Sequence, residues 1–297
     1  MAPKIVIPED LKKELPQSKW GKILGATPII MTVIATMLAG LASSEMTKAQ
    51  YDRSAAAQLQ SKAGDQWGYF QAKKMRSAIN RDSFESTEGS VDTLSLESEL
   101  LEQKISHEAF RALFGGQAPV PLVTKPEADV KAALDALDQQ KSDAEIAAVL
   151  LKISPEKLAA ALATARQDAL DYDKVIKPLD RTINIELKPV FLSFYKEKLR
   201  AFNAACFRYR ADRYDAESAL NATIGKLLEL QVRQENISAE RHHKRSGKFF
   251  FGMLAAQMAV IISTFAIAAR QKNFLWSVAA AAGLAAVSFS VYVYVWF

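Results

Sequence analysis

The side chains that most often carry catalysis or bind metals are few in this sequence, and they are scattered. The chain has one cysteine, Cys206, and three histidines, His107, His242 and His243. A single cysteine excludes an internal disulfide bond and a zinc site built from cysteines. No glycine-rich phosphate loop, nucleophile elbow or HExxH helix occurs. The sequence therefore predicts no catalytic residue, no metal site and no cofactor, and we expect a protein that is not an enzyme.

A cluster of aromatic, amide and charged side chains lies in residues 61–73, which read SKAGDQWGYFQAK. Trp67 and Phe70 are three positions apart, so they share one face of a helix. We expect this cluster either to lock two helices together or to bind a partner, because large aromatic residues and arginine commonly anchor interfaces. Its members are Asp65, Gln66, Trp67, Tyr69, Phe70 and Lys73, with Arg208, Tyr209 and Arg213 as their candidate contacts from further along the chain.

Three apolar segments lie before and after the signature cluster and carry no charged residue. They are residues 23–44, 249–269 and 274–297. About 20 residues of helix suffice to cross the hydrocarbon core of a bilayer, so each segment predicts a transmembrane helix. The first segment stands where a signal peptide would, but it is longer than a usual signal core, and we expect an uncleaved anchor. Because no span contains Asp, Glu, Lys, Arg or His, a proton pump or ion-coupled transporter is disfavoured.

Small residues recur at every fourth position within the apolar segments, which lets helix backbones approach each other closely in lipid. We expect these residues to pack helices together, within one chain or between chains. They are Thr32, Thr36 and Gly40 in the first segment, Gly252, Ala255, Ala259 and Ser263 in the second, and Ala279 and Gly283 in the third.

A basic run precedes the second apolar segment, where it would meet the membrane surface. Cationic side chains next to a span are typical of contact with lipid phosphates. We therefore expect lipid headgroups to contact Arg241, His242, His243, Lys244, Arg245 and Lys248. The net charge of +5 is modest, and the basic residues lie beside the apolar segments, so the pattern does not favour a nucleic-acid partner.

The residues between the first two spans predict a helical domain, preceded by a basic tail at residues 1–22. Residues 45–114 predict a helical stalk with a polar break at 82–92 and a further helix from Leu94 to Phe114. Residues 115–188 predict a proline-rich linker and a small helical insert, in which Ser142 and Ser154 cap helices and Pro155 takes a first helical position. The insert could also be a helix-turn-helix, but its second helix carries only Lys157 and Arg166 as basic residues, too few to read a groove.

Residues 189–248 predict one long helix that leads into the second span. Its apolar residues recur by steps of three and four, as in a rough heptad seam. We expect this seam to pair with the stalk in an antiparallel coiled coil. The seam residues are Phe202, Cys206, Tyr209, Ala216, Leu220, Thr223, Leu227, Leu230 and Ile237.

The segment from Ser61 to Lys73 resembles the "SDQWAYYQAK"-like signature of a bacterial membrane protein family known as domain of unknown function 4337. The resemblance covers about residues 20–80 and 200–297, with Gly64, Gly68 and Phe70 standing where Ser, Ala and Tyr are more usual. It implies one membrane helix, this signature, a charged coiled coil, and two closing membrane helices joined by a basic turn. It implies no activity, and the insert is extra to it.

The sequence thus predicts an all-α integral membrane protein with three transmembrane helices and a helical, coiled-coil extramembrane domain. Its partners would be the lipid bilayer and either itself or another membrane protein. We expect a scaffold or accessory subunit of a membrane complex; the alternatives are an oligomeric channel and a sensor whose insert binds a ligand. The resemblance implies a multi-pass protein of the bacterial inner membrane, and basic residues in the tail and in the turn at 270–273 predict that the helical domain is periplasmic.

Overall fold

The computed structural model describes residues 19–88, 107–114, 118–189, 196–268 and 274–296, and within these ranges every regular element is a helix. The long elements are α2 (Lys19–Glu88), α7 (Pro155–Arg181), α9 (Lys196–Ala268) and α10 (Phe274–Trp296). The short elements are α4 (His107–Phe114), α5 (Ala128–Asp138), α6 (Asp143–Leu150) and a π-helical turn, η2 (Thr182–Leu187). Helices α2, α9 and α10 each hold a stretch long and apolar enough to cross a membrane. The predicted all-α fold with three membrane helices is confirmed.

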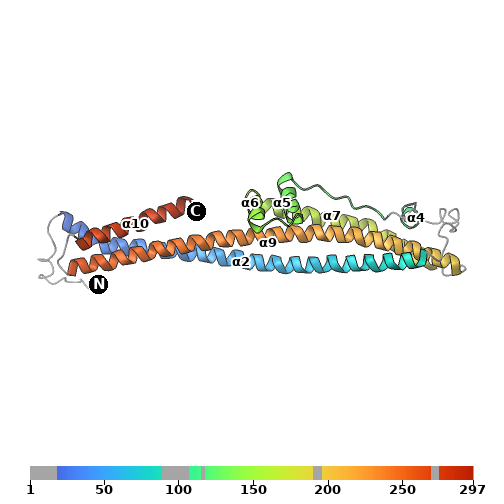
Figure 1. Ribbon diagram of the computed structural model, residues 1–297, viewed down its shortest axis with the longest axis horizontal. Helices are drawn as coiled ribbons and strands as arrows, with labels where there is room; N and C mark the ends of the chain where they lie inside the picture. The colour runs from blue at the N-terminus through green and yellow to red at the C-terminus, as the bar shows by residue number, and fades with distance from the viewer. Residues whose placement is uncertain (1–18, 89–106, 115–117, 190–195, 269–273, 297) are drawn as a thin grey trace, which may run out of the picture. The chain divides into compact units, whose positions relative to one another are not determined.

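The chain folds as two compact units, and α2 and α9 contribute to both (Figure 1). Unit 1 comprises Met1–Ser54 and Asn236–Phe297, and unit 2 comprises Ala55–Glu235. Within each unit, α2 and α9 run antiparallel. The contact of Ala42 with Ser246 in unit 1, and those of Gln66 with Asn221 and Lys74 with Asp215 in unit 2, show this order.

Unit 1 is a three-helix packing of α2, α9 and α10. Ala35, Ala256 and Ala286, one from each helix, are buried together, so the three backbones approach closely at this level. At another level, larger side chains fill the space instead. Leu38 and Ala42 of α2 contact Phe249 of α9 and Val293 of α10.

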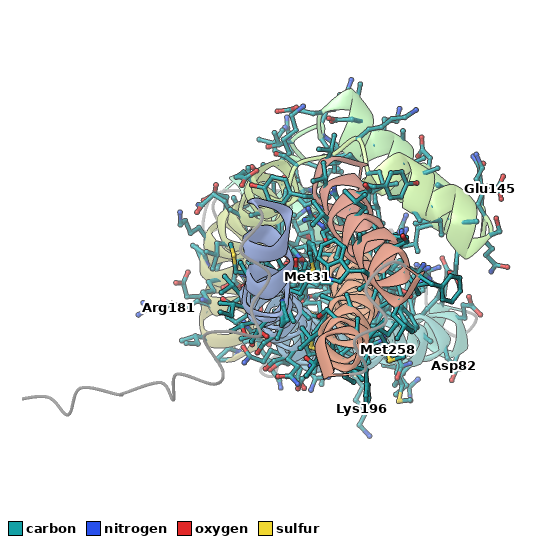
Figure 2. All side chains as sticks on the ribbon, turned by 90° about the vertical axis from the view of Figure 1, so that its left-hand side faces the viewer. Met31, Asp82, Glu145, Arg181, Lys196 and Met258 are labelled. Atoms are coloured by element: carbon teal, nitrogen blue, oxygen red, sulfur yellow. The ribbon has the colours of Figure 1, made fainter. Side chains whose placement is uncertain are left out.

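The small residues of the second and third spans lie in this packing, and those of the first span do not. A Cβ atom added to Gly252 would meet the Ser290 hydroxyl group at 3.2 Å, and one added to Gly283 would meet the end of the Met31 side chain at 2.6 Å, so both glycines have close neighbours. Met31 lies between the helices, whereas Met258, 53% exposed, lies at their outside (Figure 2). Of the other small residues in these two spans, Ala259, Ser263 and Ala279 are buried and Ala255 is half-buried.

The first span turns a different face inward from the one that its small residues suggest. Thr32, Thr36 and Gly40 are exposed, and a Cβ atom added to Gly40 would meet nothing within 4 Å. The hydroxyl groups of Thr32 and Thr36 donate to the carbonyls of Pro28 and Thr32 on their own helix. The prediction that these residues pack helices within the chain is therefore wrong, and packing between chains stays a prediction.

Unit 2 surrounds α9 with partners on two sides. One side of α9 faces α2, where Ala56, Ala63 and Ser77 of α2 are buried. The other side faces the insert and α4: Phe202, Cys206 and Tyr209 share a core with Leu179 and Ile183. A second core joins Tyr172 and Ile176 of α7 to Leu220 of α9.

Two helices of the insert begin where the sequence predicts. Ser142 accepts a hydrogen bond from the backbone N–H of Glu145, and the Glu145 side chain accepts from the backbone N–H of Ser142, which completes a capping box. Ser154 accepts from the backbone N–H of Lys157, and Pro155 occupies the first turn of α7. These two predicted caps are confirmed.

One predicted break is wrong over the residues that the structure describes. Helix α2 continues to Glu88, through residues 82–88 of the polar stretch that predicts a break at 82–92. Ser83 and Thr87 donate to carbonyls one turn back, so their hydroxyl groups are satisfied within the helix. Helix α7 runs to Arg181, and Tyr172, Ile176 and Leu179 continue its buried face. Residues 1–18 of the tail, residues 89–106 and the turn at 270–273 lie outside the described residues.

Candidate functional site

The signature cluster of residues 61–73 packs directly onto α9 in unit 2. Trp67 lies against Gly225, where an added Cβ atom would come within 3.2 Å of the indole ring. Phe70 meets Trp67 edge to face, with ring centroids 5.4 Å apart, a preferred geometry for aromatic pairs. Gln66 donates from its amide to the side-chain oxygen of Asn221. This part of the cluster therefore acts as a lock between α2 and α9.

Charged side chains extend this lock along the same two helices. Lys73 pairs with Glu217, and Lys74 lies 2.9 Å from Asp215. Arg81 lies 2.7 Å from Asp215 and is shared with Asp212. Burial alone would raise the pKa of the Asp215 carboxyl group, but hydrogen bonds from Lys74 and Ser77 outweigh it, and the pKa is lowered.

Arg213 joins α9 to the insert through a largely buried network. Its guanidinium pairs with Asp180 of α7 and, at 2.7 Å, with Glu217 of α9. Burial disfavours the charge of Arg213, but these two carboxylates raise its pKa above the ordinary value. The hydroxyl group of Tyr209 donates to Asp180 at 3.4 Å. Because Glu217 also holds Lys73, the network connects α2, α9 and α7.

The pairing within the signature differs from the predicted one. Arg208, Tyr209 and Arg213 do not contact the Trp67–Phe70 pair: Arg208 lies over the ring of Phe84 at 5.8 Å, and the other two face α7. Asp65 and Tyr69 are exposed. Sequence reasoning missed Asp180 and Glu217, since a carboxylate that pairs across helices looks like any solvent-exposed one in a single sequence.

The predicted heptad seam of α9 faces the insert as well. Phe202, Cys206 and Tyr209 pack on α4, α7 and η2, and Ala216 and Leu220 pack on α7. Burial raises the pKa of the Cys206 thiol to about 12, as expected of a core residue with little reactivity. The prediction that this seam pairs with the stalk is therefore wrong for these five residues. The α9 residues that contact α2 include Asp215, Asn221 and Gly225.

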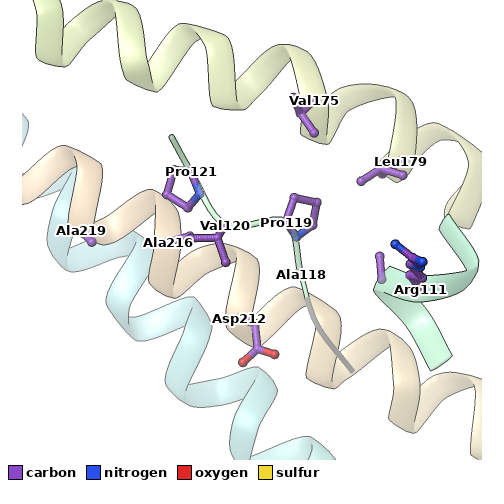
Figure 3. Close-up of a pocket in the computed structure, with 11 residues that line it drawn as sticks. Arg111, Ala118, Pro119, Val120, Pro121, Val175, Leu179, Asp212, Ala216 and Ala219 are labelled. Atoms are coloured by element: carbon purple, nitrogen blue, oxygen red, sulfur yellow. The ribbon is translucent and has the colours of Figure 1, made fainter. Parts of the chain in front are cut away.

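At least three pockets lie between the insert and α9 within the described residues. The first, of about 920 Å³, runs beneath the extended segment that contains Pro119 and Pro121, with Val175 and Leu179 of α7 on one side and Ala216 of α9 on the other (Figure 3). The second, of about 670 Å³, lies between α5, α7 and α9. Thr124 holds the extended segment by donating its N–H and hydroxyl to Asp168, at 2.8 and 2.9 Å.

A separate ionic cluster lies in unit 1, just beyond the first span. Glu45 of α2 is only 7% exposed, and its carboxylate lies 2.6 Å from Nδ1 of His242 and 3.0 Å from Nζ of Lys48. Arg245 lies 3.9 Å from the same carboxylate. Burial alone would raise the pKa of Glu45, but the contacts with His242 and Lys48 outweigh it, and the pKa is lowered.

This cluster divides the predicted headgroup residues into two groups. His242 and Arg245 point toward α2, so they serve helix pairing. Arg241, His243 and Lys244 are exposed, and Lys248 is half-exposed, so their contact with lipid stays a prediction. Glu45, which sequence reasoning missed, carried one signal: it is the first charged residue after the first apolar segment.

Among the residues that the structure describes, no group of three or more His, Cys, Asp or Glu side chains is arranged to hold a metal ion. Comparisons of the chain with family models, with curated proteins and with solved structures find no match in any of the three.

Proposed function

We propose that this chain is a membrane-anchored helical scaffold or accessory subunit without enzymatic activity, which associates with copies of itself or with another membrane protein. The resemblance to the family of unknown function supports this architecture. The proposal includes a bacterial inner membrane, supported by the same resemblance, and a periplasmic domain, supported by the basic residues of the N-terminal tail and of the turn at 270–273.

Exposed small residues of α2 carry the proposal. In unit 1 these are Thr36 and Gly40, and in unit 2 they are Gly64 and Gly68, which share a helix face with the exposed Met75. Added Cβ atoms at Gly64 and Gly68 would meet nothing within 4 Å, so nothing in the described chain requires glycine there. A helix face that only meets water usually carries charged residues. Small uncharged residues instead suit the close approach of another helix.

The test is the mass of the detergent-solubilised particle, together with identification of any protein that copurifies from native membranes. We expect a particle of several chains, or one chain with a stoichiometric foreign protein. Gly64→Leu and Gly68→Leu should leave the helical content unchanged and reduce this association. Lys62→Leu, which adds a leucine to another exposed face of α2, is the control. A monomer that captures no protein would leave the proposal without support.

The cavities of unit 2 favour a second candidate, a sensor whose insert binds a small molecule. Their volumes of about 920 and 670 Å³ match those of ordinary ligand pockets. A ligand that binds the folded chain would raise its unfolding temperature. If thermal unfolding is unchanged across a broad ligand library, this candidate loses its basis.

A further inference from the structure

We propose that His242 is a proton-controlled clamp that holds α9 to α2 at the membrane surface, independently of the proposed function. The imidazole lies between two carboxylates of α2 that are two helical turns apart. Its Nδ1 is 2.6 Å from Glu45, and its Nε2 is 4.0 Å from Oδ2 of Asp52. Both carboxylate side chains are mostly buried, 10% and 14% exposed, and the histidine is 22% exposed.

Asp52 provides the second observation. Its Oδ2 atom is buried, and within the described ranges it has no hydrogen-bond partner. A buried carboxylate oxygen without a partner is costly, because it has lost water and gained nothing in return. His242 Nε2 lies 4.0 Å from this oxygen, so a proton on Nε2 would place a positive charge within ion-pair distance of it.

The two protonation states of the ring therefore act differently on the helix pair. The imidazolium carries an N–H on both nitrogens, so it donates to Glu45 and attracts Asp52 at the same time. The neutral ring has one N–H and one lone pair, so it can serve only one of the two carboxylates and repels the other. Histidine changes its charge between about pH 5 and pH 8, so the clamp is closed at the acidic end of this range and opens as the pH rises.

The other charged groups around the ring do not replace it. On α2, Lys48 lies 3.0 Å from Glu45, and on α9, Arg245 lies 3.9 Å from the same carboxylate. These contacts bring both cations to Glu45 and neither of them to Asp52. Also on α9, Lys244 pairs with Glu240 at 3.4 Å, and His243 is exposed. Helix α10 carries no charged residue, and its two tyrosines, 292 and 294, are 50% and 71% exposed.

The experiment is a distance measurement across the clamp in the full chain, reconstituted in nanodiscs of phosphatidylcholine. Spin labels attached through Ser44→Cys and Lys244→Cys report the separation of α2 and α9 by pulsed dipolar spectroscopy. Both sites are exposed, and the buried Cys206 reacts slowly. We expect a single short distance at about pH 5, and its partial loss to a longer population at about pH 8.

Three variants assign the effect. His242→Gln should abolish the pH dependence, whereas His243→Gln, which changes the exposed neighbour, should leave it intact. Asp52→Asn should keep the short distance at both pH values, because the N–H of an asparagine amide can donate to the lone pair of the neutral ring, so the ring need not be protonated. Circular dichroism establishes that each variant is folded. A distance that is independent of pH in the native sequence, or a transition that persists in His242→Gln, would overturn the proposal.

Discussion

Trp67 and Gly225 form a contact in which a large ring on α2 fills the space left by a missing side chain on α9. Either partner alone is uninformative: a tryptophan next to a membrane is often placed at the headgroups, and a glycine within a helix costs stability. Their contact gives both residues a structural reason. The cost of Gly225 within α9 is offset by the packing of the indole ring.

Trp67→Ala should destabilise unit 2 by about 2–3 kcal/mol, somewhat less than for a fully buried tryptophan, because the ring is half-buried. The loss comes from the contacts with Gly225 and Phe70. Thermal unfolding of the detergent-solubilised chain, followed by circular dichroism, measures it. Tyr69→Ala removes an exposed ring two positions away and should change stability by less than about 0.5 kcal/mol. Equal effects of the two substitutions would contradict the lock.

Gln140, in the turn between α5 and α6, has a φ of 52°, which is in the left-handed region that favours glycine. Gln140→Gly should therefore stabilise unit 2 by about 0.5–1 kcal/mol. The matched control is Gln139→Gly, because Gln139 has a φ of −79° and gains nothing from glycine. Chemical denaturation of both variants provides the comparison, and a destabilised Gln140→Gly would show that the amide side chain matters more than the backbone.

At the scale of the elements, Arg213 is one of the side chains that connect the insert to the long helices of unit 2. It is 16% exposed and pairs with Asp180 on α7 and Glu217 on its own helix. Removing one member of a buried ion pair leaves the others charged and without compensation, which costs more than the pair itself contributes.

Arg213→Met should accordingly destabilise unit 2 by about 3 kcal/mol, the lower end of the range for buried pairs. Hydrogen exchange should show the loss first in α7, around Asp180. Lys174→Met breaks an exposed pair with Asp171 and should have almost no effect. If the two variants unfold alike, Arg213 does not hold α7 in place.

Periodicity alone identified α9 as a helix whose apolar residues, at steps of three and four, form one face. It did not identify the element against which that apolar face packs. Phe202, Tyr209 and Leu220 satisfy a heptad pattern and nevertheless pack on α4, α7 and η2. The side that meets α2 is marked by Asn221, Gly225 and Asp215, which no apolar pattern detects. The caps at Ser142 and Ser154 were predictable because a cap depends only on residues within one turn of it.

At the scale of the whole molecule, the insert is part of the core of unit 2. The resemblance suggests that residues 115–190 are additional to a simple stalk. In this chain they cover the apolar face of α9, including Phe202, Tyr209 and Leu220, each 5% exposed or less. A stalk without the insert would expose this face to water.

Replacing residues 118–187 by a short glycine–serine linker should therefore unfold or aggregate the rest of unit 2. Full exposure of each large apolar side chain costs about 1.5–3 kcal/mol, so losing cover over three or more of them approaches the 5–15 kcal/mol stability of a typical domain. The membrane helices of unit 1 have their own cores of alanine, leucine and phenylalanine, and should remain helical. Hydrogen exchange separates the two results: we expect full exchange in α2 and α9 between Ala55 and Glu235, with protection retained in the spans. Native protection of that region in the shortened chain would instead mean that α2 and α9 form a stable stalk without the insert.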